Sequence, residues 1–97
     1  MIAFEVYVNK VKVCTAGLGE LDGLIASLVC RIDQDGPPDE KKISFWVGGV
    51  GGAVDKKAYR WVSYDMLVGN RVEIRIVDAS KTDTPKEYTC PGGSCAI

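Results

Sequence analysis

The sequence has 97 residues, a formal net charge of −1 and a pI near 5.3. This length accommodates one domain, because a second hydrophobic core would leave each half too small to be stable. The weakly acidic balance excludes nucleic acid as a main partner, since phosphate binding needs a basic surface. Apolar residues at 46% and charged residues at 26% are typical of an ordered globular protein.

The first predicted element is a β-hairpin. Apolar residues occupy every second position from Ile2 to Val8, the period of a half-buried strand. Asn9-Lys10 predicts a two-residue turn, because asparagine tolerates a positive φ. Unbroken alternation on both sides of this turn pairs Val6 with Val13 on the buried face. It places Cys14 on the outer face.

Four more strands follow, over residues 24–33, 42–47, 58–63 and 72–77. The glycines from Gly48 to Gly52 predict a hairpin connection, and residues 64–67 predict one helical turn. In the last strand, Val72, Ile74 and Ile76 form a row that is predicted to face the core. From Asp78 onward the composition is polar, which predicts a tail without regular structure.

The fold class is therefore predicted to be all-β. About six short, mostly antiparallel strands would form a small sandwich or a partly open barrel with an N-terminal hairpin. The single β domain spans residues 1–78, and a flexible polar C-terminal tail spans residues 79–97.

The tail contains a pair of cysteines. Cys90 and Cys95 bracket a Pro-Gly-Gly-Ser turn that brings the two thiols close enough to form a reversible disulfide. A zinc site would need Cys14 and Cys30 as well, and their spacing is not the paired spacing of structural zinc sites. No metal site is predicted. Cys30 lies in an apolar row with Leu28 and is predicted to pack in the core.

Three aromatic residues are candidates for a binding surface. Tyr59 and Trp61 share one face of a predicted strand, and Trp46 lies on the row opposite Phe45. If the two tryptophans are neighbours on an exposed sheet, they form a platform for a protein or a sugar ring. The alternative is that these side chains fill the core between two sheets.

The composition also restricts the chemistry. The chain has no histidine, which excludes Ser-His-Asp and Cys-His catalysis, and no sequence feature calls for a cofactor. An enzyme that uses carboxylates or a thiolate is a weaker alternative than a binding domain or a redox-responsive module. No signal peptide pattern and no stretch of about 18 apolar residues are present, so no membrane partner is expected and a cytoplasmic location is predicted.

The sequence thus predicts a small intracellular domain that is not catalytic. It would bind a protein partner or associate with itself, through a sheet edge. The alternative function is a redox- or metal-responsive module that uses Cys90 and Cys95.

Overall fold

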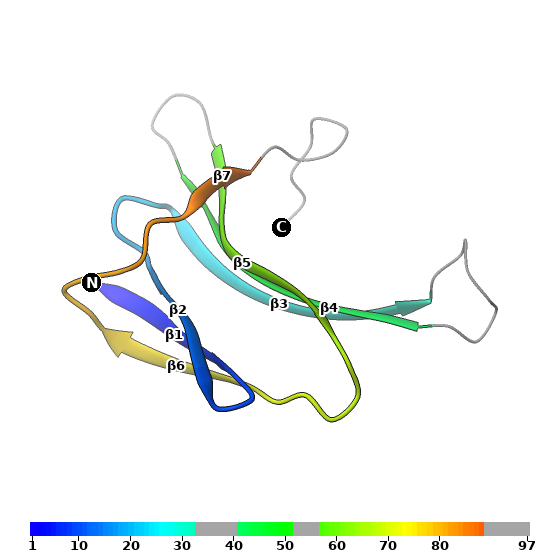
Figure 1. Cartoon of the computed structure of the whole chain (residues 1–97). Coiled ribbons are helices and arrows are strands. Elements are labelled where there is room, and N and C mark those ends of the chain that lie inside the picture. The colour runs from blue at the N-terminus through cyan, green and yellow to red at the C-terminus, as the bar shows by residue number, and fades with distance from the viewer. Residues whose placement is uncertain (33–40, 52–56, 89–97) are drawn as a thin grey trace.

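Seven antiparallel strands form two sheets in the computed structural model, which describes residues 1–32, 41–51 and 57–88. The smaller sheet has the strand order β2-β1-β6 and the larger sheet the order β3-β4-β5-β7 (Figure 1). In chain order the strands are β1 (Ile2–Val8), β2 (Val11–Gly17), β3 (Gly23–Ile32), β4 (Lys41–Gly51), β5 (Lys57–Met66), β6 (Val72–Asp78) and β7 (Lys86–Tyr88). The all-β prediction is confirmed, and both sheets are open rather than closed into one barrel.

The predicted hairpin is present, but its register shifts. Asn9 and Lys10 have φ values of 51° and 70°, as a tight turn with two left-handed residues requires. A β-bulge leaves Val13 without a partner, so Val6 lies opposite Cys14 instead of Val13. A bulge reverses the inward and outward alternation beyond it. For this reason Cys14 is buried, with 4% of its surface exposed, and the prediction that it lies on the outer face is wrong.

The first glycines of the predicted connection, Gly48, Gly49 and Gly51, belong to a strand, because β4 continues to Gly51. Gly52 lies outside the described residues. A second bulge leaves Trp61 of β5 without a partner between Val47 and Gly48 of β4. At this bulge the backbone carbonyl of Tyr59 lies so close to Gly48 that a Cβ atom there would overlap it, which explains the glycine. The predicted helical turn after residue 63 is also wrong, since β5 extends to Met66.

The segment that was predicted as a polar tail is part of the fold as far as Tyr88. The β7 strand pairs with β5, with Tyr59 opposite Glu87. Before β7, Asp83 reaches the edge of β2 and contacts Thr15 with both its backbone and its carboxylate. Polar residues form this segment because it binds through backbone groups and one carboxylate rather than through apolar side chains.

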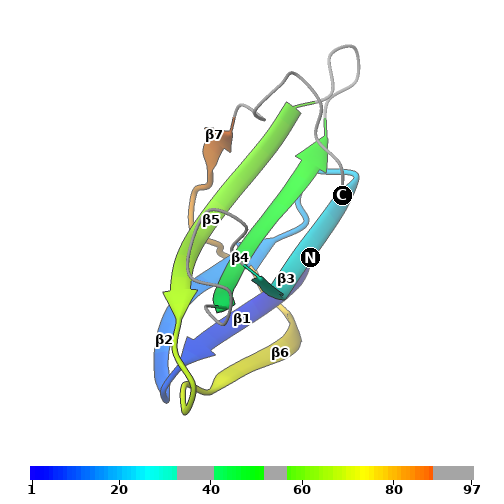
Figure 2. The same cartoon turned by 90° about the vertical axis from the view of Figure 1, so that its right-hand side faces the viewer.

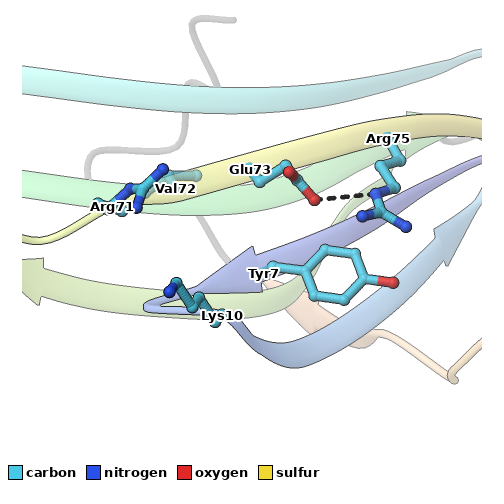
Figure 3. Close-up of a pocket in the computed structure, with 6 residues that line it drawn as sticks. All are labelled: Tyr7, Lys10, Arg71, Val72, Glu73 and Arg75. Carbon is cyan, nitrogen blue, oxygen red and sulfur yellow. Dashed lines mark hydrogen bonds and ion pairs between the residues drawn. The ribbon is translucent and has the colours of Figure 1, made fainter.

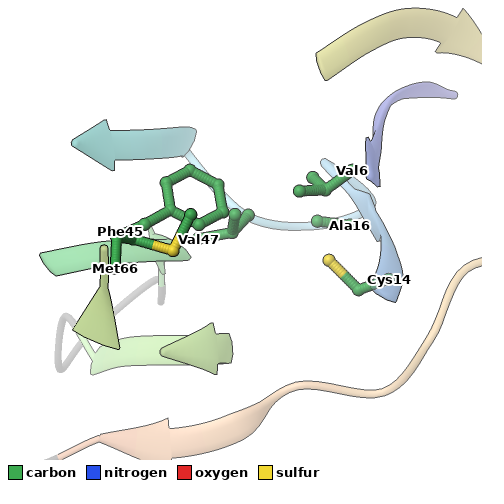
Figure 4. Packing of buried hydrophobic residues seen from close by; sticks show 6 residues of the cluster. All are labelled: Val6, Cys14, Ala16, Phe45, Val47 and Met66. Carbon is green, nitrogen blue, oxygen red and sulfur yellow. The ribbon is translucent and has the colours of Figure 1, made fainter. Parts of the chain in front are cut away.

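The core is small and lies between the two sheets. Figure 4 shows Val6, Cys14 and Ala16 of the smaller sheet facing the side chains of the larger sheet. The facing residues are Phe45, Val47 and Met66. The predicted core residue Cys30 is exposed instead.

The two sheets meet along one side of the sandwich and diverge at the other. At the closed side β2 lies against β5. We call the other side the open side, and the edge strands β6 and β3 lie there (Figure 2). Leu28 of β3 is 61% exposed there although the residue paired with it, Phe45, is 1% exposed. The open side therefore presents residues that the alternation pattern assigns to a core.

Candidate interaction surface

The free edge of β6 is the first feature of the open side. Two hydrogen bonds fix which of its residues face β1: the Asn9 amide donates to the Arg71 carbonyl at 2.8 Å, and the Ala79 amide donates to the Met1 carbonyl at 2.9 Å. Backbone groups alternate in direction along an antiparallel strand. The odd-numbered residues of β6 therefore bind β1, and the even-numbered residues direct their N–H and C=O groups away from it. No strand in the described ranges pairs with that edge.

Three of these even-numbered residues of β6 have apolar side chains, and the fourth, Asp78, ends the strand and pairs with the N-terminal amine at 2.7 Å. We call Val72, Ile74 and Ile76 the inner row of β6, because they lie on the same sheet face as the core residue Val6. Ile74 lies opposite Val6 and is 39% exposed, and Ile76 is 77% exposed. The prediction that this row is buried is thus wrong for both isoleucines. A period of two identifies the apolar face of a strand but not whether a second sheet covers it.

An apolar groove of about 280 Å³ continues from this row. Leu28 of β3 and Met66 of β5 line it, together with Val72 and the turn that joins β5 to β6. In this turn the Leu67 amide donates to the Asn70 side-chain oxygen at 2.7 Å, and Gly69 adopts a φ of 99°. The turn is therefore held in one shape. It presents Val68, which is 97% exposed, at the rim of the groove.

The opposite face of β6 is charged. A groove of about 350 Å³ lies on this face. In it the Arg75 guanidinium pairs with the Glu73 carboxylate at 2.8 Å, and Figure 3 draws both side chains. The Arg75 guanidinium also lies over the Tyr7 ring, 5.0 Å from its centre. Lys10 and Arg71 line the same groove. The β6 strand thus has one apolar face and one charged face, and both reach its unpaired edge.

The structure does not bring the three predicted aromatic residues together. Trp46 lies under the Arg60 guanidinium, 4.6 Å from the ring centre. Trp61 packs against the core from the other face of the sheet, and its indole N–H donates to the Asp83 carbonyl at 2.7 Å. Tyr59 is half-buried opposite Gly49. The geometry therefore gives no shared platform of Trp46 and Trp61.

The predicted redox pair, Cys90 and Cys95, lies outside the described residues. The other two cysteines have opposite environments, since Cys14 is buried and Cys30 is exposed. Burial raises the pKa of the Cys14 thiol to about 11, and the negative charge of Asp83 adds to this rise. A thiol of this kind stays protonated and inert at neutral pH. No group of three residues suited to hold a metal ion occurs in the described part of the chain.

Sequence reasoning missed two residues that this surface brings forward. Alternation alone places Ile74 and Ile76 in the core, and the local sequence carries no signal of their exposure. Within the described ranges no helix has the length and apolar character needed to cross a membrane. Neither a family model, nor a curated protein, nor a solved structure matches this chain.

Proposed function

We propose that this chain is a protein-binding domain without catalytic activity, and that it receives a β-strand of a protein partner along β6. The observation that supports this proposal is the coincidence of two features on the same residues. The backbone groups of Ile74 and Ile76 point to an edge with which no described strand pairs, and their side chains form an exposed apolar row. Main-chain hydrogen bonds then supply affinity and the side-chain row supplies selectivity in strand addition.

Within the described part of the chain, the central residues of the β6 edge lack the usual devices that prevent strand addition. Natural edge strands are protected by proline, by bulges, by inward-pointing charges or by a covering segment. The sequence of β6 contains no proline, and its pairing with β1 runs without a bulge from Val8–Val72 to Ile2–Asp78. The charged side chains in the middle of the strand, Glu73 and Arg75, lie on the outer face, and the third, Asp78, lies at its end, paired with the N-terminal amine at 2.7 Å. An incoming strand therefore meets a straight edge with an apolar inner face.

The apolar groove extends the surface beyond the backbone edge. Its volume of about 280 Å³ is larger than a single aliphatic side chain, and Val72 belongs both to the groove and to the inner row of β6. A partner strand that pairs with β6 places its own apolar side chains beside Val72. Burial of such a side chain contributes about 1.5–3 kcal/mol relative to leaving it in water.

Titration with an extended peptide tests the proposal. The probe is an eight-residue peptide in which valine alternates with glutamate and lysine. The control peptide has the same sequence with methylated backbone nitrogens, which cannot donate hydrogen bonds. We expect the probe to shift the NMR signals of Ile74 and Ile76 and to slow exchange of their amide protons. If neither the probe nor shuffled alternating peptides protect these amides more than the methylated control, the proposal is wrong.

The alternative function, a redox- or metal-responsive module that uses Cys90 and Cys95, concerns residues outside the described ranges and stays a prediction. Mass spectrometry of the native protein, with and without reductant, tests it. A change of about 2 Da in the peptide that contains both cysteines is the mass of the two hydrogens lost when a disulfide forms. The same mass in both samples would rule out a disulfide between them.

A further inference from the structure

We propose that the strand received by β6 is β6 of a second copy of this chain, aligned antiparallel about a two-fold axis at Ile74. This inference rests on the proposed function and names its partner. A two-fold interface uses one surface patch twice, so the strand must be complementary to itself. The sequence Val-Glu-Ile-Arg-Ile of β6 has this property in one alignment.

The backbone limits the alignments that are available. Only the even-numbered residues of β6 direct N–H and C=O groups to the free edge, as the hydrogen bonds of Arg71 and Ala79 establish. A second β6 must therefore pair even residues with even residues. Alignments shifted by one residue would place outward groups opposite inward ones. Of the seven residues of β6, a two-fold axis at Arg75 pairs all seven, and an axis at Ile74 or at Ile76 pairs five, over 72–76 or 74–78.

Charge selects among these three alignments. With the axis at Arg75, each Arg75 faces Arg75 of the second copy. Like charges that lie directly opposite are destabilising. With the axis at Ile76, the carboxylate of Asp78 lies beside the apolar side chain of Ile74 of the second copy. With the axis at Ile74, each Glu73 faces Arg75 of the second copy, and this pair occurs twice. The axis at Ile74 is the alignment of the three that creates only opposite-charge pairs.

The inner row of β6 is complementary in the same alignment. Ile74 lies beside Ile74 of the second copy, and Val72 lies beside Ile76 of the second copy. Ile76 is 77% exposed and Val72 lines the apolar groove, so the most exposed residue of one row is brought to the groove of the other copy. The two smaller sheets join into one sheet of six strands, and the exposed isoleucines form its continuous apolar centre.

Charge-reversal variants of the full chain test this pairing. E73R leaves only arginines at the two positions and R75E only glutamates, so each variant places like charges opposite twice. Analytical ultracentrifugation should show dimerisation of the wild-type chain and a dissociation constant raised about tenfold or more in each variant. An equimolar mixture of the two variants should dimerise again, because arginines then face glutamates at both pairs. The double variant E73R/R75E should also dimerise.

Matched controls lie at the other end of the molecule. Lys57 and Glu87 form an ion pair at 3.7 Å between β5 and β7, and the side chain of Glu87 is 59% exposed against 58% for Glu73. E87R and K57E change the net charge as E73R and R75E do, and they should leave the dissociation constant within twofold of wild type. Far-UV circular dichroism reports whether each variant is folded.

The outcomes separate this inference from the proposed function. A wild-type chain that stays monomeric at millimolar concentration overturns pairing with a second copy, while protection of Ile74 by the alternating peptide would still support strand addition. A dimer that ignores both reversals, or a mixture that does not recover, overturns the alignment. If a variant fails to fold, slower amide exchange of Ile74 and Ile76 with rising wild-type concentration supports the pairing. Exchange that does not depend on concentration overturns it.

Discussion

The two edges of the smaller sheet flank the same central strand, β1, and differ in what lies across them. At the β2 edge, the Asp83 amide donates to the Thr15 carbonyl at 2.9 Å and the Thr15 amide donates to the Asp83 carboxylate at 2.7 Å. At the β6 edge, nothing within the described ranges binds the outward backbone groups of Ile74. One edge is closed by a segment of the chain itself, and no segment in the described ranges closes the other.

The exposure of the side chains on the two edge strands follows this difference. The small residues of β2 are buried, and the isoleucines of β6 are exposed. Cys14 and Ala16 of β2 are 4% and 0% exposed, whereas Ile74 and Ile76 of β6 are 39% and 77% exposed. Isoleucine is among the residues most often buried in proteins. In an isolated chain this distribution is unfavourable, because the larger apolar side chains remain in water. The strand addition proposed for β6 would remove these isoleucines from water.

The largest contrast between the closed and open sides is expected for Phe45 and Leu28, which lie opposite each other on β4 and β3. Phe45→Ala should lower the free energy of unfolding by about 3–5 kcal/mol, because the ring is fully buried. Leu28→Ala is its matched control and should cost below about 1 kcal/mol. Urea unfolding at micromolar concentration measures both values. Equal losses would mean that the open side is covered within one chain.

Removal of the Asp83 carboxylate that binds the edge of β2 is expected to have the next largest effect on the free energy of unfolding. Asp83→Ala leaves the amide of Thr15, a residue only 8% exposed, without its acceptor and should cost about 1–3 kcal/mol. Asp65→Ala removes an exposed carboxylate from β5 and serves as the control, with an expected change within about 0.5 kcal/mol. Urea unfolding compares the two. If they unfold at the same urea concentration, Asp83 does not stabilise the closed edge.

The buried thiol of Cys14 predicts a pH dependence of the closed edge. Its pKa is raised from about 9 to about 11 by burial and by Asp83, while Lys12 lowers it. Between these values the folded chain keeps a proton that the unfolded chain has lost, so stability falls as pH rises through this window. Thermal unfolding from pH 8 to pH 11 should show a steeper fall for wild type than for Cys14→Ala. Parallel curves would contradict the prediction.

The ion pair on the outer face of the hairpin is expected to have the smallest effect. Lys12 donates to Glu5 at 3.1 Å, and this hydrogen bond raises the pKa of Lys12. The lysine side chain is 46% exposed, and exposed pairs of this kind contribute little to stability. Lys12→Ala should unfold at the same urea concentration as Lys10→Ala, which removes a lysine from the turn. A clear loss for Lys12→Ala alone would show that surface charge, as well as Asp83, holds the closed edge.

The hairpin shows how far alternation carries a prediction. The turn at Asn9-Lys10 and the strands on both sides follow from local residue types. The bulge at Val13 does not, because the chain there is as regular in sequence as in an unbroken strand. Because of this single extra residue, Cys14 lies on the buried face instead of the predicted outer face. The prediction that Cys30 is buried is wrong for a different reason. Cys30 does lie in an apolar row, but the row extends beyond the sheet that covers it.

The candidate surface shows that alternation predicts the apolar face of a strand but not its burial. The alternation in β6 correctly predicted a strand with one apolar and one charged face. Whether Ile74 is buried depends on the distance between two sheets, and that distance is set by β2 and β5, which lie elsewhere in the sequence. The contribution of Asp83 was hidden for a similar reason. Its role depends on the backbone of Thr15, 68 residues away, and polar composition gives no sign of that partner.

The position of β1 at the centre of its sheet has a consequence for the order in which the chain folds. Its contacts with β2 close a two-residue turn, whereas its contacts with β6 join Ile2 to Asp78 across most of the sequence. Such distant pairings form slowly, because the intervening chain must first be brought together. We expect the hairpin to form early, and one edge of β1 then stays unpaired until β6 pairs with it. During that interval β1 offers the same kind of strand edge that β6 presents in the finished fold, so the folding intermediate is the species most exposed to mispairing between chains.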